Sequence, residues 1–233
     1  MRALELLDLD PSPKFLLDLG CGSGLSGQVL SDNGHVWVGL DISNDMLEIA
    51  SQNRTGDLFL QDLGAGLGFR PGTFDGAFSI SALQWLCNAD QTNHDPRKRL
   101  YRFFSTLYTA LVRGARAVFQ FYPENENQTE MILAQAVKAG FSGGLVVDYP
   151  NSAKAKKYYL CLFAGSDGSK MELPEALDDE YSVPFENSRI KGKSKRSAKD
   201  KQWVLHKKEL YRSRGKVTPL DSKFTARKRR PKF

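Results

Sequence analysis

Residues 15–24 read FLLDLGCGSG, and this stretch decides the fold of the 233-residue chain. An apolar run that opens into alternating glycines is typical of a buried strand turning sharply into a helix, with bare backbone brought against a ligand. A second apolar run, residues 36–40, ends on Asp41, which lies 21 residues after Gly20. This spacing predicts a carboxylate at the end of the next parallel strand, where it can accept both hydroxyls of a ribose. The two stretches together predict a nucleoside pocket.

The order of the glycines favours a methyl donor over a dinucleotide. Dinucleotide folds carry G-x-G-x-x-G, which lets a helix N-terminus lie close under a pyrophosphate. Here the order is G-x-G-x-G, and Asp18 precedes the first glycine by two residues. Its carboxylate would repel a pyrophosphate but suits the ammonium group of S-adenosylmethionine. Asp62 ends a third predicted strand, where it either contacts adenine or caps a helix; with Asp18 and Asp41 it is expected at the crevice beyond the strand ends.

Strands alternate with helices over residues 1–165, which predicts a doubly wound, seven-stranded, mostly parallel sheet of the Rossmann-like kind. The short loop 149–153 predicts a hairpin, so the last strand is expected to be antiparallel, which fits a methyltransferase better than a dehydrogenase half-domain. Basic residues of one helix, Arg97, Lys98, Arg99 and Arg102, are expected to face solvent. The expected strands are 15–19, 36–40, 56–62, 74–80, 115–122, 145–148 and 157–163. The expected helices are one whose end is residues 4–9, then 26–33, 44–53 after a Ser43 cap, 96–111 and 126–139.

Charge divides the chain unevenly. Residues 1–185 hold 15 Lys and Arg against 23 Asp and Glu, whereas residues 186–233 hold 18 against 4. We therefore expect a domain over 1–165, an acidic linker over 166–185 and a basic tail over 186–233 that is largely extended or loosely helical until it meets a polyanion. RNA, DNA and a nuclear import receptor are the candidate partners. Interleaved aromatic residues, Trp203, Tyr211 and Phe224, could stack on exposed bases.

The cysteines and the hydropathy of the chain give expectations about its surroundings. Cys21, Cys87 and Cys161 form no C-x-x-C pair, and we expect packing roles for them rather than nucleophilic ones. The sequence holds no secretory signal and no run of 18 apolar residues, so a reducing interior compartment and no membrane partner are expected. No metal site is predicted.

The same residues resemble a known family. Residues 16–24 with 39–43 look like the nucleotide loop and acidic strand end of class I S-adenosylmethionine-dependent methyltransferases. Residues 74–89 and 119–125, with the basic runs 192–196 and 227–233, resemble the eukaryotic 18S rRNA (guanine-N7) methyltransferases of small-subunit biogenesis. This resemblance covers essentially the whole chain. It implies 18S rRNA in the pre-40S particle as substrate, S-adenosyl-L-methionine as cofactor, and a nuclear location, in nucleoplasm and nucleolus, with the cytoplasm as a further location.

The resemblance also implies a heterodimer with a small zinc-containing activator protein, and roles for individual residues. No catalytic residue is obligatory, because guanine N7 is an imine nitrogen with an in-plane lone pair and no proton to remove. Trp85, Tyr122 and Pro123 are expected to position the guanine, and Ala82 is expected near the methyl group. For Trp85 the alternative is a place in the core or at a partner interface. Cofactor contacts are expected from Asp18, Gly20, Gly22, Gly24, Asp41, Ile42, Asp62, Leu63 and Ser79.

Two further hypotheses accompany this one. Family members carry several dozen residues before the first strand that help to close the pocket, whereas Met1 falls within the last helix of that segment. We therefore expect a shorter isoform, a fragment or a divergent member. The chain could then be a pre-ribosome assembly factor that uses the fold as a binding scaffold, with catalysis weak or absent. A third hypothesis is a methyltransferase acting on a protein or a small molecule.

Overall fold

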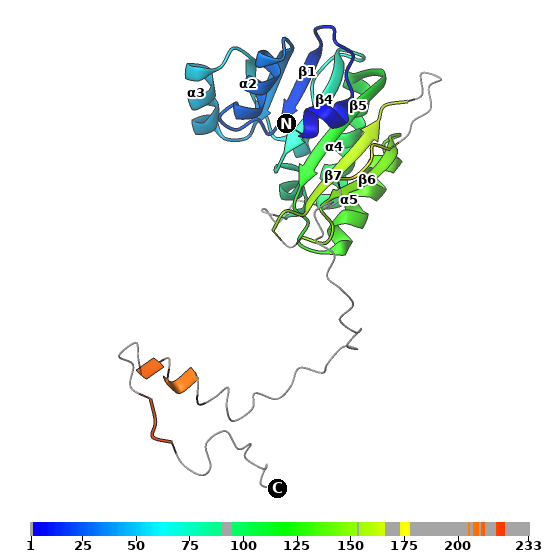
Figure 1. Ribbon diagram of the computed structural model, residues 1–233. Helices are drawn as coiled ribbons and strands as arrows, with labels where there is room; N and C mark the ends of the chain where they lie inside the picture. The colour runs from blue at the N-terminus through cyan, green and yellow to red at the C-terminus, as the bar shows by residue number, and fades with distance from the viewer. Residues whose placement is uncertain are drawn as a thin grey trace. The chain divides into compact units, whose positions relative to one another are not determined.

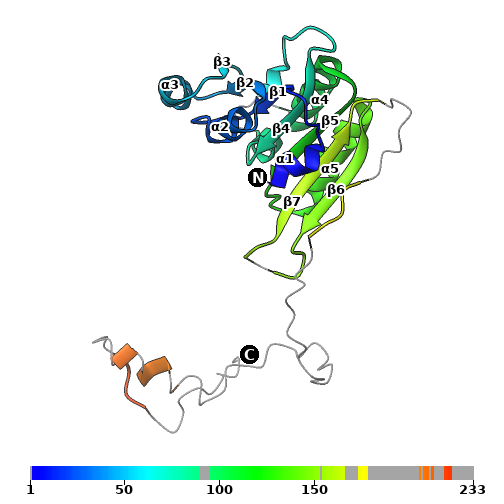
Figure 2. The same ribbon diagram turned by 45° about the horizontal axis from the view of Figure 1, so that its top comes forward.

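The computed structural model describes residues 2–89, 95–152, 154–165 and 173–177, and in the tail residues 205, 207–209, 211–212 and 218–221. Contacts divide the chain into two units, residues 1–181 and residues 182–233. The first unit is a single sheet covered by helices (Figures 1 and 2).

Seven strands form the sheet in the order β3-β2-β1-β4-β5-β7-β6. β7 pairs antiparallel with both β5 and β6, and every other pairing is parallel. This confirms the predicted mixed sheet and its antiparallel last strand. The strand order reverses direction between β1 and β4, so a crevice is expected beyond their carboxyl ends. The strands are β1 Phe15–Leu19, β2 Val36–Asp41, β3 Asp57–Leu60, β4 Phe74–Ile80, β5 Leu111–Phe121, β6 Ser142–Asp148 and β7 Lys157–Phe163.

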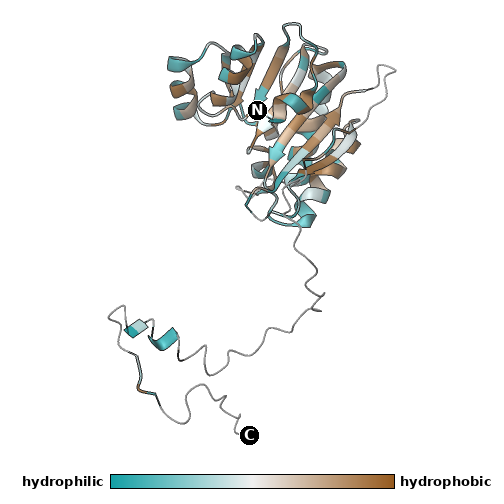
Figure 3. Ribbon diagram, viewed as in Figure 1, coloured by the Kyte–Doolittle hydropathy of each residue, from teal (hydrophilic) through white to brown (hydrophobic). Residues whose placement is uncertain are grey.

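Helices on the two faces of the sheet bury two separate hydrophobic clusters. One cluster joins α4 and α5 to the sheet, with Phe103, Phe104 and Phe119 in edge and tilted ring contacts. The other joins α1, α2 and α3 to the opposite face, around Trp37 and Phe78. Brown hydrophobic colour accordingly runs along the strands in Figure 3. The helices are α1 Arg2–Leu7, α2 Leu25–Asp32, α3 Asn44–Asn53, α4 Pro96–Ala110 and α5 Glu126–Lys138, with 3-10 turns η1 Leu63–Ala65 and η2 Leu83–Cys87.

Several predicted boundaries were wrong, for local reasons. The first helix ends at Leu7 rather than at Leu9, because Asp8 takes a left-handed φ of 49°. The third strand ends at Leu60, since the Asp62 side chain instead caps η1. β5 begins at Leu111 and runs through Gly114, which was expected to separate it from α4. β6 likewise begins three residues early, at Ser142.

The segment 173–177 is the last described part of the first unit and contacts its N-terminal helix. Leu177 N donates to Asp148 Oδ1 at 3.0 Å, and Arg2 Nε donates to Asp148 Oδ2 at 3.1 Å. Arg2 Nη2 also donates to the Glu175 carbonyl at 2.7 Å, and Tyr149 N donates to the Leu177 carbonyl at 2.8 Å. Asp148 is buried at the end of β6. We call Arg2, Asp148, Glu175 and Leu177 the Asp148 clasp; it ties part of the predicted linker to the domain.

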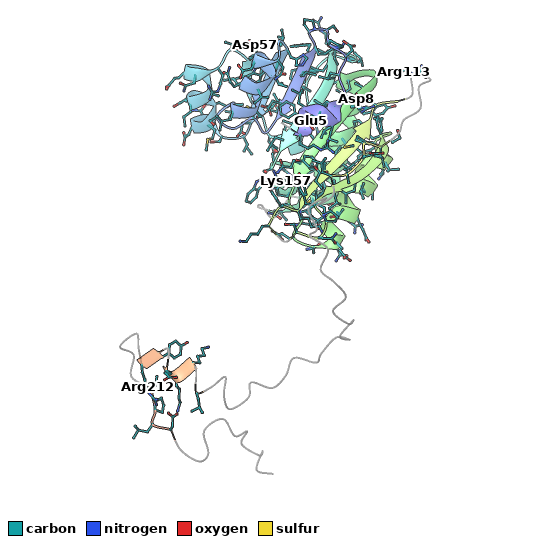
Figure 4. The ribbon with its side chains drawn as sticks, viewed as in Figure 1. Glu5, Asp8, Asp57, Arg113, Lys157 and Arg212 are labelled. Carbon is teal, nitrogen blue, oxygen red and sulfur yellow. The ribbon has the colours of Figure 1, made fainter. Side chains whose placement is uncertain are left out.

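Only short pieces of the tail are described. Leu205, residues 207–209 and residues 211–212 are helical. Lys208 Nζ and Arg212 Nη2 both contact the Asp221 carboxylate, at 2.8 and 2.9 Å (Arg212 is labelled in Figure 4). The described pieces therefore include short helical segments, and two of their basic side chains bind one acid. Trp203, Phe224 and the rest of the predicted basic tail lie outside the described residues.

Candidate active site

The glycine loop leaves β1 in a left-handed conformation that side chains rarely adopt. Gly20 and Gly22 have φ values of 78° and 52°. A Cβ on Gly20 would lie 2.3 Å from the Ala82 Cβ, whereas one on Gly22 would meet no atom within 4 Å. Gly20 N donates to the Leu40 carbonyl at 2.8 Å, which ties the loop to β2. The loop thus packs tightly on one side and leaves open space beside Gly22.

Asp41, at the end of β2, organises the backbone around this loop. Its Oδ2 accepts from Gly22 N at 2.8 Å, and its Oδ1 accepts from Ser43 N at 2.8 Å. Ser43 in turn caps α3 by accepting from Met46 N at 3.4 Å, as predicted. An ionised carboxylate has about four lone-pair sites, so Asp41 keeps capacity for two further donors such as the hydroxyls of a ribose.

A cavity of about 610 Å³ lies at the carboxyl edge of the sheet. This volume falls within the range of pockets that hold nucleoside-sized ligands. Six predicted cofactor residues line it, and Trp85 joins them in the wall. The full wall is Gly20, Gly22, Asp41, Ile42, Met46, Gln61, Asp62, Leu63, Ile80, Ser81, Ala82, Trp85, Leu86 and Arg99. The sequence did not indicate Met46, Gln61, Ile80, Ser81, Leu86 or Arg99.

Three predicted cofactor residues lie behind the wall instead. Asp18 is wholly buried; its Oδ2 accepts from the Ser26 hydroxyl at 2.6 Å and its Oδ1 has no hydrogen-bond partner. Burial raises the pKa of Asp18 to about 7. Ser79 is also buried and donates to the Leu19 carbonyl at 2.6 Å. Gly24, with a φ of 76°, is the N-cap residue of α2. Asp18, Ser79 and Gly24 therefore support the glycine loop from the side away from the cavity.

Asp62 and Arg99 form an ion pair in the cavity wall. Arg99 Nη1 donates to Asp62 Oδ2 at 3.0 Å and Arg99 Nη2 donates to Asp62 Oδ1 at 2.9 Å, while Gly64 N donates to Oδ1 at 2.9 Å. The prediction that Arg99 faces solvent was wrong, because α4 packs on η1 and only 16% of this side chain is exposed. One signal could have placed it: Arg99 precedes the buried Phe103 by four residues, so both lie on one helix face.

The three residues predicted to position guanine are separated. Trp85 on η2 lies in the cavity wall with 65% of its surface exposed, so the core role considered for it is excluded. Tyr122 follows β5, is 48% exposed and accepts from Gln120 Nε2 through its hydroxyl, but is not part of the wall. Pro123 lines a second hollow with Glu124 and Tyr158. Trp85 is the one of the three that the structure brings to the cavity.

The ionisable side chains of the wall are Asp41, Asp62 and Arg99. Burial raises the pKa of the Cys21 thiol to about 12 and those of Cys87 and Cys161 to about 11, so none is a thiolate at neutral pH.

Over the described residues, no group of three or more His, Cys, Asp or Glu side chains is arranged to hold a metal ion. In the same part of the chain no helix has the length and apolar character needed to span a membrane.

This sheet order, the glycine loop after β1 and the acid at the end of β2 define a class I S-adenosylmethionine-dependent methyltransferase. A putative S-adenosylmethionine-dependent methyltransferase from Listeria monocytogenes shares the fold, with a TM-score of 0.53 and 15% identity over 70% of this chain and 95% of that chain. So does a Haemonchus contortus phosphoethanolamine N-methyltransferase 2 in complex with S-adenosyl-L-methionine, with a TM-score of 0.53 and 16% identity over 71% of this chain and 52% of that one.

Sequence comparisons give the family. The profile described as "Methyltransferase domain" matches residues 17–119, and that described as "Methyltransferase involved in Williams-Beuren syndrome" matches residues 162–231. The Mus musculus "18S rRNA (guanine-N(7))-methyltransferase" is 54% identical over all of this chain and 85% of its own length. The Saccharomyces cerevisiae "18S rRNA (guanine(1575)-N(7))-methyltransferase" is 53% identical over all of this chain and 87% of its own. The chain belongs to the 18S rRNA (guanine-N7) methyltransferase family, which confirms the resemblance.

Proposed function

We propose that this chain is an enzyme that transfers a methyl group from S-adenosylmethionine to N7 of a guanine in 18S rRNA during maturation of the small ribosomal subunit. One observation carries the proposal: a single cavity joins the glycine loop and Asp41 to the exposed indole of Trp85. A cofactor subsite and an aromatic platform for a base thus adjoin each other. Family membership over the full chain supports the same activity.

The residues of the cavity fit the cofactor. The open space beside Gly22 leaves room for a ligand against bare backbone, and Asp41 has acceptor capacity for the ribose hydroxyls. Ile42, with 70% of its surface exposed, offers an apolar surface for the adenine ring, and Asp62 with Leu63, in the same wall, would meet the adenine edge. S-adenosylmethionine supplies an electrophilic methyl group on a sulfonium. Asp18 and Ser79 support this subsite from behind.

The acceptor side needs alignment rather than proton transfer. Guanine N7 carries a lone pair and no proton, so no general base is required and the task of the protein is to hold the ring in line with the methyl group. The wall supplies Trp85 as a stacking surface, and stacking of a base on an aromatic side chain contributes about 1–3 kcal/mol. In this reaction the side chains of Asp41, Asp62 and Arg99 neither donate nor accept a proton.

The proposal is tested with the full chain, an 18S rRNA transcript and labelled S-adenosylmethionine, with N7-methylguanine identified by mass spectrometry. Trp85→Ala should lower kcat/KM by about tenfold or more while cofactor affinity is unchanged, as expected for lost stacking. Tyr101→Ala is the matched control, because Tyr101 is an exposed aromatic residue on α4 outside the cavity wall. Absence of N7-methylguanine in the wild-type product would contradict the proposal.

Two variants separate the enzyme from the other hypotheses. If Asp41→Ala abolishes cofactor binding yet leaves production of small ribosomal subunits intact, the scaffold role dominates. Replacing the four basic residues 227–230 by Gln should weaken rRNA binding and flatten its salt dependence, since each phosphate contact releases counterions. Turnover that is unaffected by these replacements would favour a protein or small-molecule substrate.

The finer assignments of partners and location are also part of the proposal. A small zinc-containing activator protein would cover apolar surface, and β3 provides such surface because it is an edge strand with exposed Phe59 and Leu60. The helix α3, which contacts β3, also exposes Ile49. The chain expressed alone should therefore aggregate, and a stable monomer in size-exclusion chromatography would count against this partner. The tail would bind a nuclear import receptor, with the protein in the nucleoplasm and nucleolus and also in the cytoplasm; imaging of the 227–230 variant tests this.

A further inference from the structure

We propose that the hydroxyl of Ser81 donates to O6 of the target guanine and so holds the N7 edge of the base toward the methyl group. This inference rests on the proposed function, because it concerns the acceptor base of the same reaction. Ser81 lies between the end of β4 and the start of η2, in the wall of the cavity. It contacts the substrate and takes no proton from it.

The backbone of Ser81 has a conformation that residues with a Cβ rarely adopt. Its φ is 59°, in the left-handed region. Glycine takes this conformation at no steric cost, whereas a serine is strained there. Strained residues of this kind cluster at binding and catalytic sites. We therefore expect the serine side chain to perform a task that glycine could not.

Hydrogen bonds hold both backbone groups of Ser81. Its N donates to the Gln120 carbonyl of β5 at 2.8 Å, and its carbonyl accepts from Gln84 Nε2 at 2.8 Å. The hydroxyl, in contrast, makes no hydrogen bond within the described part of the chain. The fixed backbone thus leaves one unused hydroxyl on the cavity wall.

The turn that carries Ser81 contacts both subsites of the cavity. Trp85 N donates to the Ala82 carbonyl at 3.2 Å, so the indole platform belongs to the same turn as Ser81. On the other side, a Cβ on Gly20 would lie 2.3 Å from the Ala82 Cβ, so this turn also packs on the glycine loop. A base stacked on Trp85, with its N7 at the methyl group, would therefore present its N7 edge to Ser81.

The N7 edge of guanine needs a hydrogen-bond donor. It carries two acceptors, N7 and O6, and N7 must stay unbonded because its lone pair attacks the methyl group. Among the other side-chain donors of the wall, Gln61 Nε2 already donates to two carbonyls, and Arg99 donates to the Asp62 carboxylate. The indole N–H of Trp85 lies in the plane of its ring and points away from a base stacked on its face. The Ser81 hydroxyl is the donor left for O6.

The test compares methylation of two 18S rRNA fragments by the full chain, after the methylated guanine has been located by mass spectrometry. One fragment carries guanine at that position, and the other carries 2-aminopurine, which keeps N7 and lacks O6. Ser81→Ala should lower kcat/KM on the guanine fragment by about threefold to tenfold, as expected for one lost hydrogen bond, and leave it unchanged on the 2-aminopurine fragment. Calorimetric binding of S-adenosylhomocysteine should not change.

Two further variants separate the hydroxyl from the backbone. Ser81→Gly removes the hydroxyl and also relieves the strained φ, so it should show the kinetic loss of Ser81→Ala with a Tm no lower than that of Ser81→Ala. Ser51→Ala is the matched control, because Ser51 is an exposed serine on α3 outside the cavity wall, and it should keep wild-type kinetics.

Three results would overturn the inference while the proposed function stands: an equal loss on both fragments, wild-type kinetics of a folded Ser81→Ala protein, or weakened binding of S-adenosylhomocysteine by that variant. Absence of N7-methylguanine from the wild-type product would instead overturn the proposed function. Should Ser81→Ala not fold, Ser81→Gly takes its place. Should the 2-aminopurine fragment not be methylated, 6-thioguanine replaces it; sulfur accepts a hydrogen bond more weakly than oxygen, so the loss caused by Ser81→Ala should be smaller there than on guanine.

Discussion

Replacing Asp18 by Asn should change how the stability of the fold depends on pH. Burial raises the pKa of this carboxyl to about 7 from an ordinary value of 3.8; the Ser26 hydrogen bond opposes the shift and the nearby Asp41 charge adds to it. Between these two values the folded protein keeps a proton that the unfolded chain releases. The stabilisation is therefore fully present below pH 3.8 and is lost as the pH rises through 7.

The size of the effect follows from the shift. About 3 pKa units at 1.36 kcal/mol each give about 4 kcal/mol of unfolding free energy, lost by the wild-type protein between about pH 4 and pH 8. Asn cannot titrate, so the Asp18→Asn variant lacks this contribution to the slope.

Urea unfolding of both proteins from pH 4 to pH 8, followed by tryptophan fluorescence, measures the difference, because other titrating groups cancel in the comparison. Asp45→Asn is the matched control for loss of one negative charge, since Asp45 is exposed on α3. Parallel curves for wild type and Asp18→Asn would refute the reasoning.

Three further predictions concern packing and buried hydrogen bonds. Gly27→Ala should lower Tm, because the new Cβ would lie 2.3 Å from Trp37 Cζ2 and overpacking costs about 1–3 kcal/mol; an unchanged Tm would contradict this contact. Ser79→Ala should lower the free energy of unfolding by about 0.5–1.5 kcal/mol in denaturant unfolding, because the buried hydrogen bond to the Leu19 carbonyl is lost. Cofactor affinity should stay nearly unchanged, since Ser79 lies behind the cavity wall. Asp148→Ala should speed amide exchange in α1, because Arg2 loses its buried carboxylate partner and keeps the exposed Glu5; unaltered exchange there would show that the pair does not hold the helix.

The bounds of a strand could be predicted best where a proline or glycine lies close to an apolar run. β1, β4 and β7 have the predicted bounds, since Pro13, Gly72 and Gly165 flank apolar runs that suit only a buried strand. Asp62 shows the limit of this reasoning: a strand end and a helix cap both favour an acid, and only the contact with Gly64 N decides between them. The mixed sheet and the glycine loop were therefore predictable, but the ends of β3, β5 and β6 were not.

Contacts between residues distant in the chain could not be read from patterns. The Asp62 to Arg99 pair joins residues 37 apart, and nothing local distinguishes Arg99 from the exposed Lys98 beside it except its place on the buried helix face. The depth of Asp18 was missed for a similar reason. An acid before a glycine loop suggests a ligand, whereas the structure surrounds this side chain with the loop and α2. Five of the six further wall residues are neutral and carried no chemical signal of their own.

The Asp148 clasp affects how the two ends of the first unit unfold. Ends of domains are ordinarily where fraying and proteolysis begin, each end independently of the other. Here Arg2 and Leu177 both donate to the buried carboxylate of Asp148, and Arg2 also donates to the Glu175 carbonyl. Opening of either end therefore removes the anchor of the other, and the two should unfold as one cooperative unit. The same proximity makes the first unit suitable for circular permutation, with a short linker from Leu177 back to Arg2 and new ends in a loop remote from the cavity.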